Sequence, residues 1–172
     1  MEVKNRKNKY IPYRKINDKK VTIMWDYKPI YKKNAKGETI ETPLAVWQEK
    51  TFNYIPSFKE IKKVILDYYN SEIDNEILTG FTWNEMKIWL SSENQFNYKA
   101  AYDLVIQTNG ENLPIIFKFG DDETPIYYEF KTIEDITNFY TSCINYIQKT
   151  LLNGWEKKEN INWAFYEKND IY

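Results

Sequence analysis

The stretch that decides the fold covers residues 80–110 and reads GFTWNEMKIWLSSENQFNYKAAYDLVIQTNG. Two short apolar runs, FTW and KIWL, lie on either side of a tight turn and predict a β-hairpin. The polar run that follows favours a helix start, because Ser92 and Gln95 have the spacing of a capping box. Gly110 can take the positive φ that ends a helix. The predicted buried stripe of this helix consists of Phe96, Ala100, Ala101, Leu104 and Val105.

Two further helices and two further strands extend this pattern on either side. Ser57 and Glu60 form a second capping box, ahead of a helix that should run to about residue 78. Extended runs follow at 115–119 and 126–130, and Thr132 begins a long last helix that Gly154 is predicted to end. Residues 57–172 therefore predict an α+β domain of order α-β-β-α-β-β-α, with antiparallel strands covered by helices and Trp83 in the core.

Residues 21–56 predict a β-hairpin extension in front of this domain. Apolar residues alternate along its first strand, and residues 34–37, NAKG, supply the turn. An isolated two-stranded hairpin is marginally stable in water. We therefore expect its aromatic face to be buried mainly against a partner chain, through Trp25, Tyr27 and Trp47.

Residues 1–20 carry eight Lys or Arg and two acids, and form a basic N-terminal arm. The arm is either a mobile terminus or a segment that orders against an acidic partner surface. Only Arg6 and Arg14 occur in the chain, and Arg is the preferred residue for bidentate base contacts, so specific nucleic-acid recognition is not expected. No apolar run approaches the roughly 18 residues of a membrane span.

Catalytic chemistry is restricted by the absence of histidine and by the single cysteine, Cys143. These exclude Ser-His-Asp and Cys-His pairs, zinc clusters and disulfides. Cys143 lies on an apolar helix stripe and is predicted to be a core thiol. Asp121, Asp122 and Glu123 offer oxygen ligands for a hard cation, but the EF-hand spacing is missing and a solvated loop is favoured. We predict no cofactor, no metal site and no enzymatic activity.

Trp89 is the best candidate for a surface contact outside the hairpin. It shares a strand face with Lys87, opposite Ile88 and Leu90, and a tryptophan in that place can stack on sugars or bases. Packing beneath the last helix is the alternative for this side chain.

Several segments carry a family resemblance: Phe81-Thr82-Trp83-Asn84, Ile88-Trp89-Leu90-Ser91 and the run from Glu93 to Ala101, with Leu113-Pro114, Phe117-Lys118-Phe119 and Gly154-Trp155 in the same pattern. Over residues 57–163 the sequence resembles a domain of unknown function from tailed phages and prophages. That domain often ends proteins encoded near tail fibres and other virion genes. This chain departs from it at the hairpin turn, where Glu85 stands in place of the expected glycine.

The resemblance implies a non-enzymatic structural protein of a tailed-phage virion, associated with the tail or a fibre. Such a protein would act by protein–protein contacts in a multi-copy homo- or hetero-oligomer, with tail, fibre or connector proteins as partners. Its expected location is the virion, and the host cytoplasm during assembly. A fibre-assembly chaperone absent from the mature virion is the alternative, and a carboxylate-dependent hydrolase fits least. The predicted partner-binding residues are Trp25, Tyr27, Trp47 and Trp89.

Overall fold

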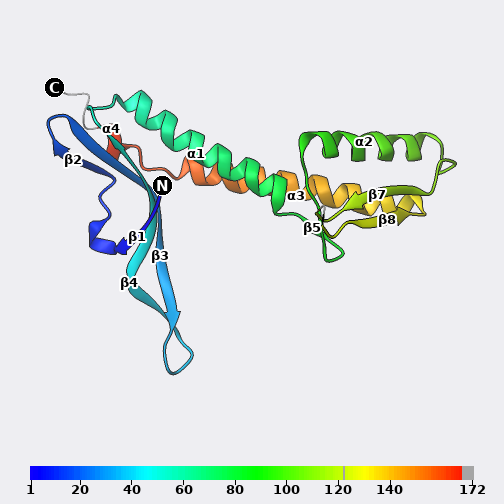
Figure 1. Ribbon diagram of the computed structural model, residues 1–172, viewed down its shortest axis with the longest axis horizontal. Coiled ribbons are helices and arrows are strands. Elements are labelled where there is room, and N and C mark those ends of the chain that lie inside the picture. Colours follow the sequence, from blue (N-terminus) through cyan, green and yellow to red (C-terminus); the bar gives the residue numbers. More distant parts are fainter. Residues whose placement is uncertain (122, 168–172) are drawn as a thin grey trace. The chain divides into compact units, whose positions relative to one another are not determined.

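The computed structural model describes residues 1–121 and 123–167, and its contacts divide the chain into two compact units. The sheet unit comprises residues 1–67 and 161–172, and the helix unit comprises residues 68–160. Figure 1 shows the elements of both units. The α+β fold with antiparallel strands and N-terminal strands is confirmed. The division between the units falls inside the first long helix, not at residue 57, where the sequence suggested a domain boundary.

The sheet unit is built on four antiparallel strands in the order β1-β4-β3-β2. Their bounds are Glu2–Arg6 for β1, Tyr13–Asn17 for β2, Lys20–Lys33 for β3 and Thr39–Phe52 for β4, with the single-turn helix η1 at Lys7–Lys9. The first half of α1, Phe58–Thr79, and the short α4, Ala164–Glu167, belong to the same unit.

The basic arm is part of this sheet, so its interpretation as a mobile terminus is wrong. Val3 of β1 lies opposite Trp47, and Tyr13 of β2 lies opposite Ile23. The physical reason is that β3 and β4 expose two long edges, and each edge offers unpaired backbone groups to a further strand. The two short strands satisfy those groups over the half of the hairpin nearest to α1.

A β-bulge at Asp26 changes which side chains share a face of the sheet. Trp25 lies opposite Gln48 but Lys28 lies opposite Val46, so three residues of β3 span two of β4, and Asp26 has a φ of 55°. An odd number of residues across a bulge reverses the alternation of faces. Trp25 and Tyr27 therefore point to opposite faces, although their spacing predicted a common one.

The helix unit contains two small hairpins and three helical segments. Besides the second half of α1 these are β5 at Thr82–Trp83, β6 at Met86–Lys87, α2 at Ser92–Gln107, β7 at Ile115–Phe119, β8 at Ile126–Phe130 and α3 at Ile133–Glu159. The turn between β5 and β6 has positive φ at both Asn84 and Glu85, as a type I′ turn requires. The tight hairpin forms even without the glycine that such turns favour.

Helices α2 and α3 pack with β7 and β8 around a core that is mostly aromatic. Phe139 of α3 lies 5.0 Å from Tyr98 of α2 and 5.2 Å from Phe130 of β8, measured between ring centroids. Trp83 is half-buried against this cluster, 5.6 Å from Phe130 in a stacked arrangement. The predicted place of Trp83 at the core is therefore confirmed, although the ring is not fully enclosed.

The helix caps follow the sequence pattern with two corrections. Ser57 and Glu60 form the predicted capping box, with hydrogen bonds in both directions. The cap of α2 is Ser91, one residue earlier than predicted, and its hydroxyl accepts from the amide of Asn94 at 3.2 Å. Gly154 does not end α3, which continues to Glu159. It is a buried position in the middle of the helix, where the backbone passes close to Ile73 of α1.

Candidate functional site

Two of the predicted partner-binding residues, Trp25 and Trp47, lie inside the sheet unit. Trp47 is only 1% exposed, and its ring meets Tyr10 edge-on at 5.8 Å. Trp25 is 5% exposed. The prediction that the aromatic face of the hairpin is buried mainly against a partner chain is therefore wrong for both tryptophans. For Trp47 the cause is long-range packing, because Tyr10 arrives from the N-terminal segment and packs against its ring. The hydroxyl of Tyr166 donates to the carbonyl of Met24, the residue before Trp25, at 2.6 Å.

Tyr27 differs from Trp25, because the bulge at Asp26 places it on the opposite face of the sheet, the face that carries Trp47 and Tyr10. It is 36% exposed, and its ring lies 4.9 Å from that of Tyr10. Burial raises the pKa of Tyr10 above its ordinary value. Tyr27 thus lies at the edge of the packed sheet, where the outer part of the β3–β4 hairpin begins.

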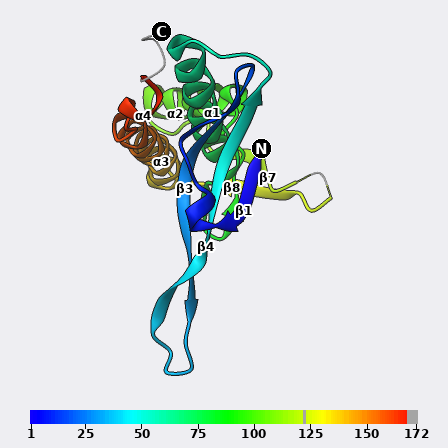
Figure 2. The ribbon, with the colours of Figure 1, turned by 90° about the vertical axis from the view of Figure 1, so that its left-hand side faces the viewer.

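The outer part of this hairpin, residues 30–42, is called the ribbon below. The pairing of β1 with β4 ends at Leu44, and the pairing of β2 with β3 ends at Ile23, so only β3 and β4 continue into the ribbon. Figure 2 shows it extending beyond the other strands of the sheet unit. Tyr31 is 56% exposed and Ile40 is 38% exposed, and their successive places in the register put one exposed apolar side chain on each face of the ribbon.

The ribbon is held in one conformation by hydrogen bonds at its two ends. At the tip, the Asn34 side-chain oxygen accepts from the amides of Lys36 at 2.9 Å and Glu38 at 3.0 Å, and Gly37 takes a positive φ. At the base, the Thr42 hydroxyl donates to the Ile30 carbonyl at 2.7 Å. These bonds support a long two-stranded structure that would otherwise be marginal in water.

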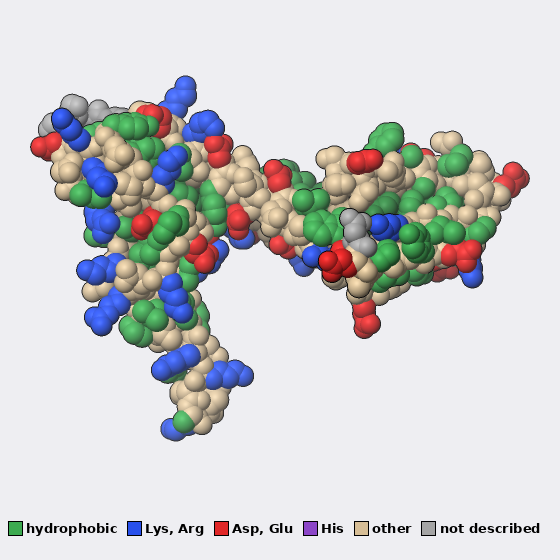
Figure 3. Space-filling model, in the orientation of Figure 1, with side chains coloured by type: hydrophobic (Ala, Val, Ile, Leu, Met, Phe, Trp, Pro, Cys, Tyr) green, Lys and Arg blue, Asp and Glu red, His purple; other side chains and the backbone are tan. Residues whose placement is uncertain are grey.

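The ribbon also carries uncompensated positive charge. Lys32, Lys33 and Lys36 form no ion pair with any part of the chain that the structure describes. Of the two ribbon acids, Glu41 pairs with Lys7 of η1, and Glu38 keeps its charge while it accepts from the Asn34 side-chain amide at 2.8 Å, so the three lysines leave a net positive charge on the ribbon. Figure 3 shows Lys and Arg side chains over the sheet unit and its ribbon.

A second exposed surface lies on the outer side of α2, where the predicted burial is wrong for three of its five residues. Phe96 is 72% exposed, Leu104 is 48% exposed, and Ala100 between them is also exposed. The helix packs through the stripe that contains Tyr98 and Val105, so the predicted burial is confirmed for Val105 and for the partly buried Ala101. The helical pattern thus offered two overlapping apolar stripes. The buried one is the stripe with the tyrosines, since Tyr98 meets Phe139 edge-on and Tyr102 stacks on Tyr140.

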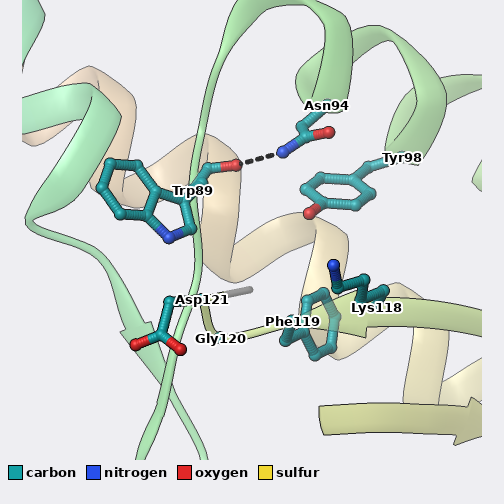
Figure 4. Close-up of a pocket in the computed structure, with 7 residues that line it drawn as sticks. All are labelled: Trp89, Asn94, Tyr98, Lys118, Phe119, Gly120 and Asp121. Atoms are coloured by element: carbon teal, nitrogen blue, oxygen red, sulfur yellow. Dashed lines mark hydrogen bonds between the residues drawn. The ribbon is translucent and has the colours of Figure 1, made fainter. Parts of the chain in front are cut away.

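Trp89 lies beside a hollow of about 450 Å³ in the helix unit, drawn in Figure 4. The ring is half-buried and is not part of the aromatic core. Lys87 places its amino group 4.8 Å from the centre of the indole, and Asn94 donates to the Trp89 carbonyl at 2.8 Å. The hollow is lined by Trp89, Asn94, Tyr98, Lys118, Phe119, Gly120 and Asp121. An aromatic ring beside such donors and acceptors can take up a polar ring, so a stacking contact at Trp89 stays a prediction.

The acidic loop beside this hollow uses its first carboxylate to hold its own turn. Asp121 accepts from the Thr124 hydroxyl at 2.8 Å and from the amides of Thr124 and Glu123. These hydrogen bonds, those of Thr124 foremost, lower the pKa of Asp121. Asp122 lies outside the described residues. Among the residues that are described, no group of His, Cys, Asp and Glu is arranged to hold a metal ion.

Comparisons of this chain with protein-family models, curated proteins and solved structures find no match. Among residues 1–121 and 123–167, no helix combines the length and the apolarity needed to cross a membrane. The surfaces described above are therefore the basis on which a function can be proposed, together with the resemblance seen in the sequence.

Proposed function

We propose that this chain is a non-enzymatic structural protein of a tailed-phage virion, associated with the tail or a fibre. It acts by protein–protein contacts in a multi-copy assembly. The resemblance of residues 57–163 to a phage domain supplies the biological setting. The observation that carries the proposal is the ribbon, residues 30–42, which leaves the sheet with exposed apolar and charged side chains on a preformed two-stranded scaffold.

The ribbon suits protein contact because little order has to be created when it binds. Its tip and base are already fixed by the hydrogen bonds of Asn34 and Thr42. Preorganisation of this kind reduces the entropy lost on association, so a small surface can contribute useful affinity. Tyr31 is the strongest candidate anchor, since exposed tyrosines are enriched among the residues that dominate binding energy.

The charge of the ribbon favours an acidic protein surface as its partner. Lys32, Lys33 and Lys36 add positive charge that the chain itself does not neutralise. Complementary charges accelerate encounter and set the register of a contact more than they add affinity. Lysine is a flexible point charge and lacks the planar fork with which arginine reads bases and phosphates, which fits a protein partner better than a nucleic acid.

The test is quantitative mass spectrometry of particles purified from a lysate of the phage that encodes this chain. We expect the chain in the particles, in several copies relative to a tail component. A variant phage with Tyr31→Ser and Lys33→Glu should yield particles that contain less of it. A chain that is abundant in the infected cell but missing from particles would overturn the virion role and favour an assembly chaperone.

A further inference from the structure

The two units carry opposite charges of nearly equal size. By sequence, the sheet unit holds 17 Lys or Arg and 10 Asp or Glu, and the helix unit holds 7 Lys or Arg and 15 Asp or Glu. The net charges are therefore +7 and −8, although the whole chain is close to neutral. A distribution of this kind makes the sheet unit of one molecule attractive to the helix unit of another.

The helix unit offers a matching apolar surface on α2. Glu93, Phe96, Ala100 and Leu104 follow one another at helical spacing and form what is called the α2 outer face below. Phe96 is the most exposed large apolar side chain of this face, at 72%. Glu93 in the first turn forms no ion pair with the described residues. A contiguous apolar stripe that its own chain leaves uncovered marks a contact surface.

The ribbon has the complementary features in its cross-strand register. Tyr31 lies opposite Glu41 and Lys33 lies opposite Thr39, so Tyr31 and Lys33 project from the same face of the ribbon. That face carries one aromatic ring and one unpaired cation, and the Glu41 carboxylate beside Tyr31 is paired with Lys7. The α2 outer face pairs one aromatic ring with one unpaired anion. We propose that the ribbon of one copy docks on the α2 outer face of a second copy, with Tyr31 against Phe96 and Lys33 towards Glu93.

This inference names the partner of the ribbon and in that respect rests on the proposed function. It also has a geometric consequence. The two surfaces belong to different parts of the chain, so the contact is heterologous, and each molecule keeps one ribbon and one α2 outer face for further neighbours. A repeated heterologous contact closes into a ring or grows into a filament. Both outcomes supply the multi-copy arrangement that a virion component needs.

Sedimentation velocity over a concentration series tests the contact with purified full-length chain. We expect the wild type to self-associate at low ionic strength and to dissociate as added salt shortens the Debye length from about 10 Å to about 3 Å. Two variants should each raise the Kd of self-association by about tenfold or more. The ribbon variant carries Tyr31→Ser with Lys33→Glu, and the face variant carries Phe96→Ser with Leu104→Ser. All four positions are exposed, so the fold should survive, as circular dichroism will verify.

Matched controls separate this contact from general effects of charge and apolarity. Lys19→Glu with Lys59→Glu reverses two exposed charges of the sheet unit outside the ribbon. Leu152→Ser removes an apolar side chain of α3 that is 60% exposed. Leu152→Ser should associate like the wild type. The charge control, which lowers the net charge of the sheet unit from +7 to +3, should weaken association much less than the ribbon variant does. If they weaken association as much as the ribbon and face variants do, the contact does not lie where we place it.

A mixing experiment distinguishes a heterologous contact from a symmetric one. The ribbon variant retains an intact α2 outer face, and the face variant retains an intact ribbon. An equimolar mixture should therefore form discrete dimers, whereas each variant alone stays monomeric. A mixture that stays monomeric overturns the proposal. A wild type that stays monomeric throughout the concentration series overturns the proposal as well. The same holds if this monomer binds duplex DNA through its ribbon.

The two proposals fail in different experiments. A chain that is found in particles but stays monomeric in solution removes this contact and leaves the virion role intact. A chain that passes the mixing experiment but is missing from particles removes the virion role and leaves the contact in place.

Discussion

At the residue scale, the glycine at position 154 is compatible with two structural roles, a helix C-cap and a close approach of two helices. A glycine after a long apolar helix stripe is typical of a C-terminal cap, which is how the sequence was interpreted. In the structure it is a buried residue of α3, and a Cβ at this position would overlap the Cγ1 and Cδ1 atoms of Ile73 in α1. The glycine is present because two helices approach closely, and sequence spacing alone does not distinguish that reason from a helix end.

The first prediction follows from this close approach. In an exposed helix, Gly→Ala stabilises by roughly 0.5–1 kcal/mol because alanine restricts the unfolded chain. At Gly154 the added methyl has no space, so Gly154→Ala should lower the free energy of unfolding by about 1–3 kcal/mol. The measurement is urea denaturation followed by circular dichroism, and a stabilised variant would show that the two helices separate freely.

The matched control for Gly154→Ala is a second substitution across the contact. Ile73→Val removes the Cδ1 atom that the new methyl would meet, and alone it should cost about 0.5–1.5 kcal/mol. In the double variant the two losses of unfolding free energy should be less than additive, because the shorter side chain at position 73 leaves room for the added methyl group. Additive losses would place the cause of the Gly154→Ala effect elsewhere.

At the scale of elements, the β5–β6 hairpin depends on a single side chain. Each of its strands has two residues, which is too short for independent stability. Trp83 compensates by inserting its indole among three rings: it stacks on Phe130 and meets Tyr128 and Phe139 edge-on, at 5.0 and 5.1 Å. The hairpin is thus stabilised by tertiary packing more than by its own ladder.

Trp83→Ala should therefore lower the free energy of unfolding by about 3 kcal/mol. This is the low end of the range for replacing a buried aromatic residue by alanine, because the ring is half-buried. The unfolding midpoint in urea measures this loss. Trp155→Ala is the control, since Trp155 is 50% exposed on α3 and its loss should change stability by no more than about 0.5 kcal/mol. Equal midpoints for the wild type and Trp83→Ala would mean that the ring contributes nothing to the core.

How far the sequence predicted each element depended on how local its determinants are. The strands at residues 115–119 and 126–130 and the caps at Ser57 and Thr132 were found because their signals lie within a few residues. β1 was missed because its only reason to be a strand is the edge of β4, which is supplied by the distant residues 44–48. β2 was missed although its partners on β3 lie only three to ten residues away, because its sequence YRKIN shows no apolar alternation. The bulge at Asp26 was also missed, since nothing in the alternation signals one extra residue.

Limited proteolysis should distinguish the paired N-terminal strands from the uncovered ribbon. Because β1 and β2 are paired, trypsin should leave residues 1–20 in place and cut first in the ribbon, after Lys33 or Lys36. Both lysines are exposed next to a turn that no third strand covers. Mass spectrometry of the early fragments identifies the site. Early loss of the N-terminal twenty residues would mean that β1 and β2 open readily in solution.

At the scale of the whole molecule, the candidate surfaces were predictable only in part. The place of Trp89 outside the aromatic core and the excess of basic residues near the N-terminus could be inferred from residue types. The burial of Trp47 could not, because it depends on Tyr10, which comes from the distant N-terminal segment. The opposite charges of the two units were hidden as well, since the boundary between the units falls within α1 and near the end of α3, where composition does not change abruptly.

The last prediction concerns the response of the whole molecule to alkaline pH. Burial raises the pKa of Cys143 from 9.0 to about 12, and burial followed by the proximity of Cys143 raises the pKa of Tyr98 from 10.0 to about 12. Between pH 9 and 12 the unfolded chain therefore releases protons that the folded chain retains. Stability falls with pH wherever the folded state binds more protons. The contribution of both groups is complete below about pH 9 and is lost as the pH rises towards 12.

Thermal unfolding measured at intervals across this range should give a Tm that declines steadily from about pH 9 upwards. Cys143→Ala removes the group that loses its proton first in the unfolded chain, so the fall in Tm should begin nearer to pH 10, the ordinary pKa of tyrosine. The variant should also start from a lower Tm at neutral pH, because it leaves a cavity in the core. Leu152→Ala, an exposed change on the same helix, should leave the pH profile of the wild type unaltered. A Tm that stays level to pH 11 would mean that the thiol and the phenol ionise in the folded protein as readily as in the unfolded chain, and that the interior around Phe139 admits water.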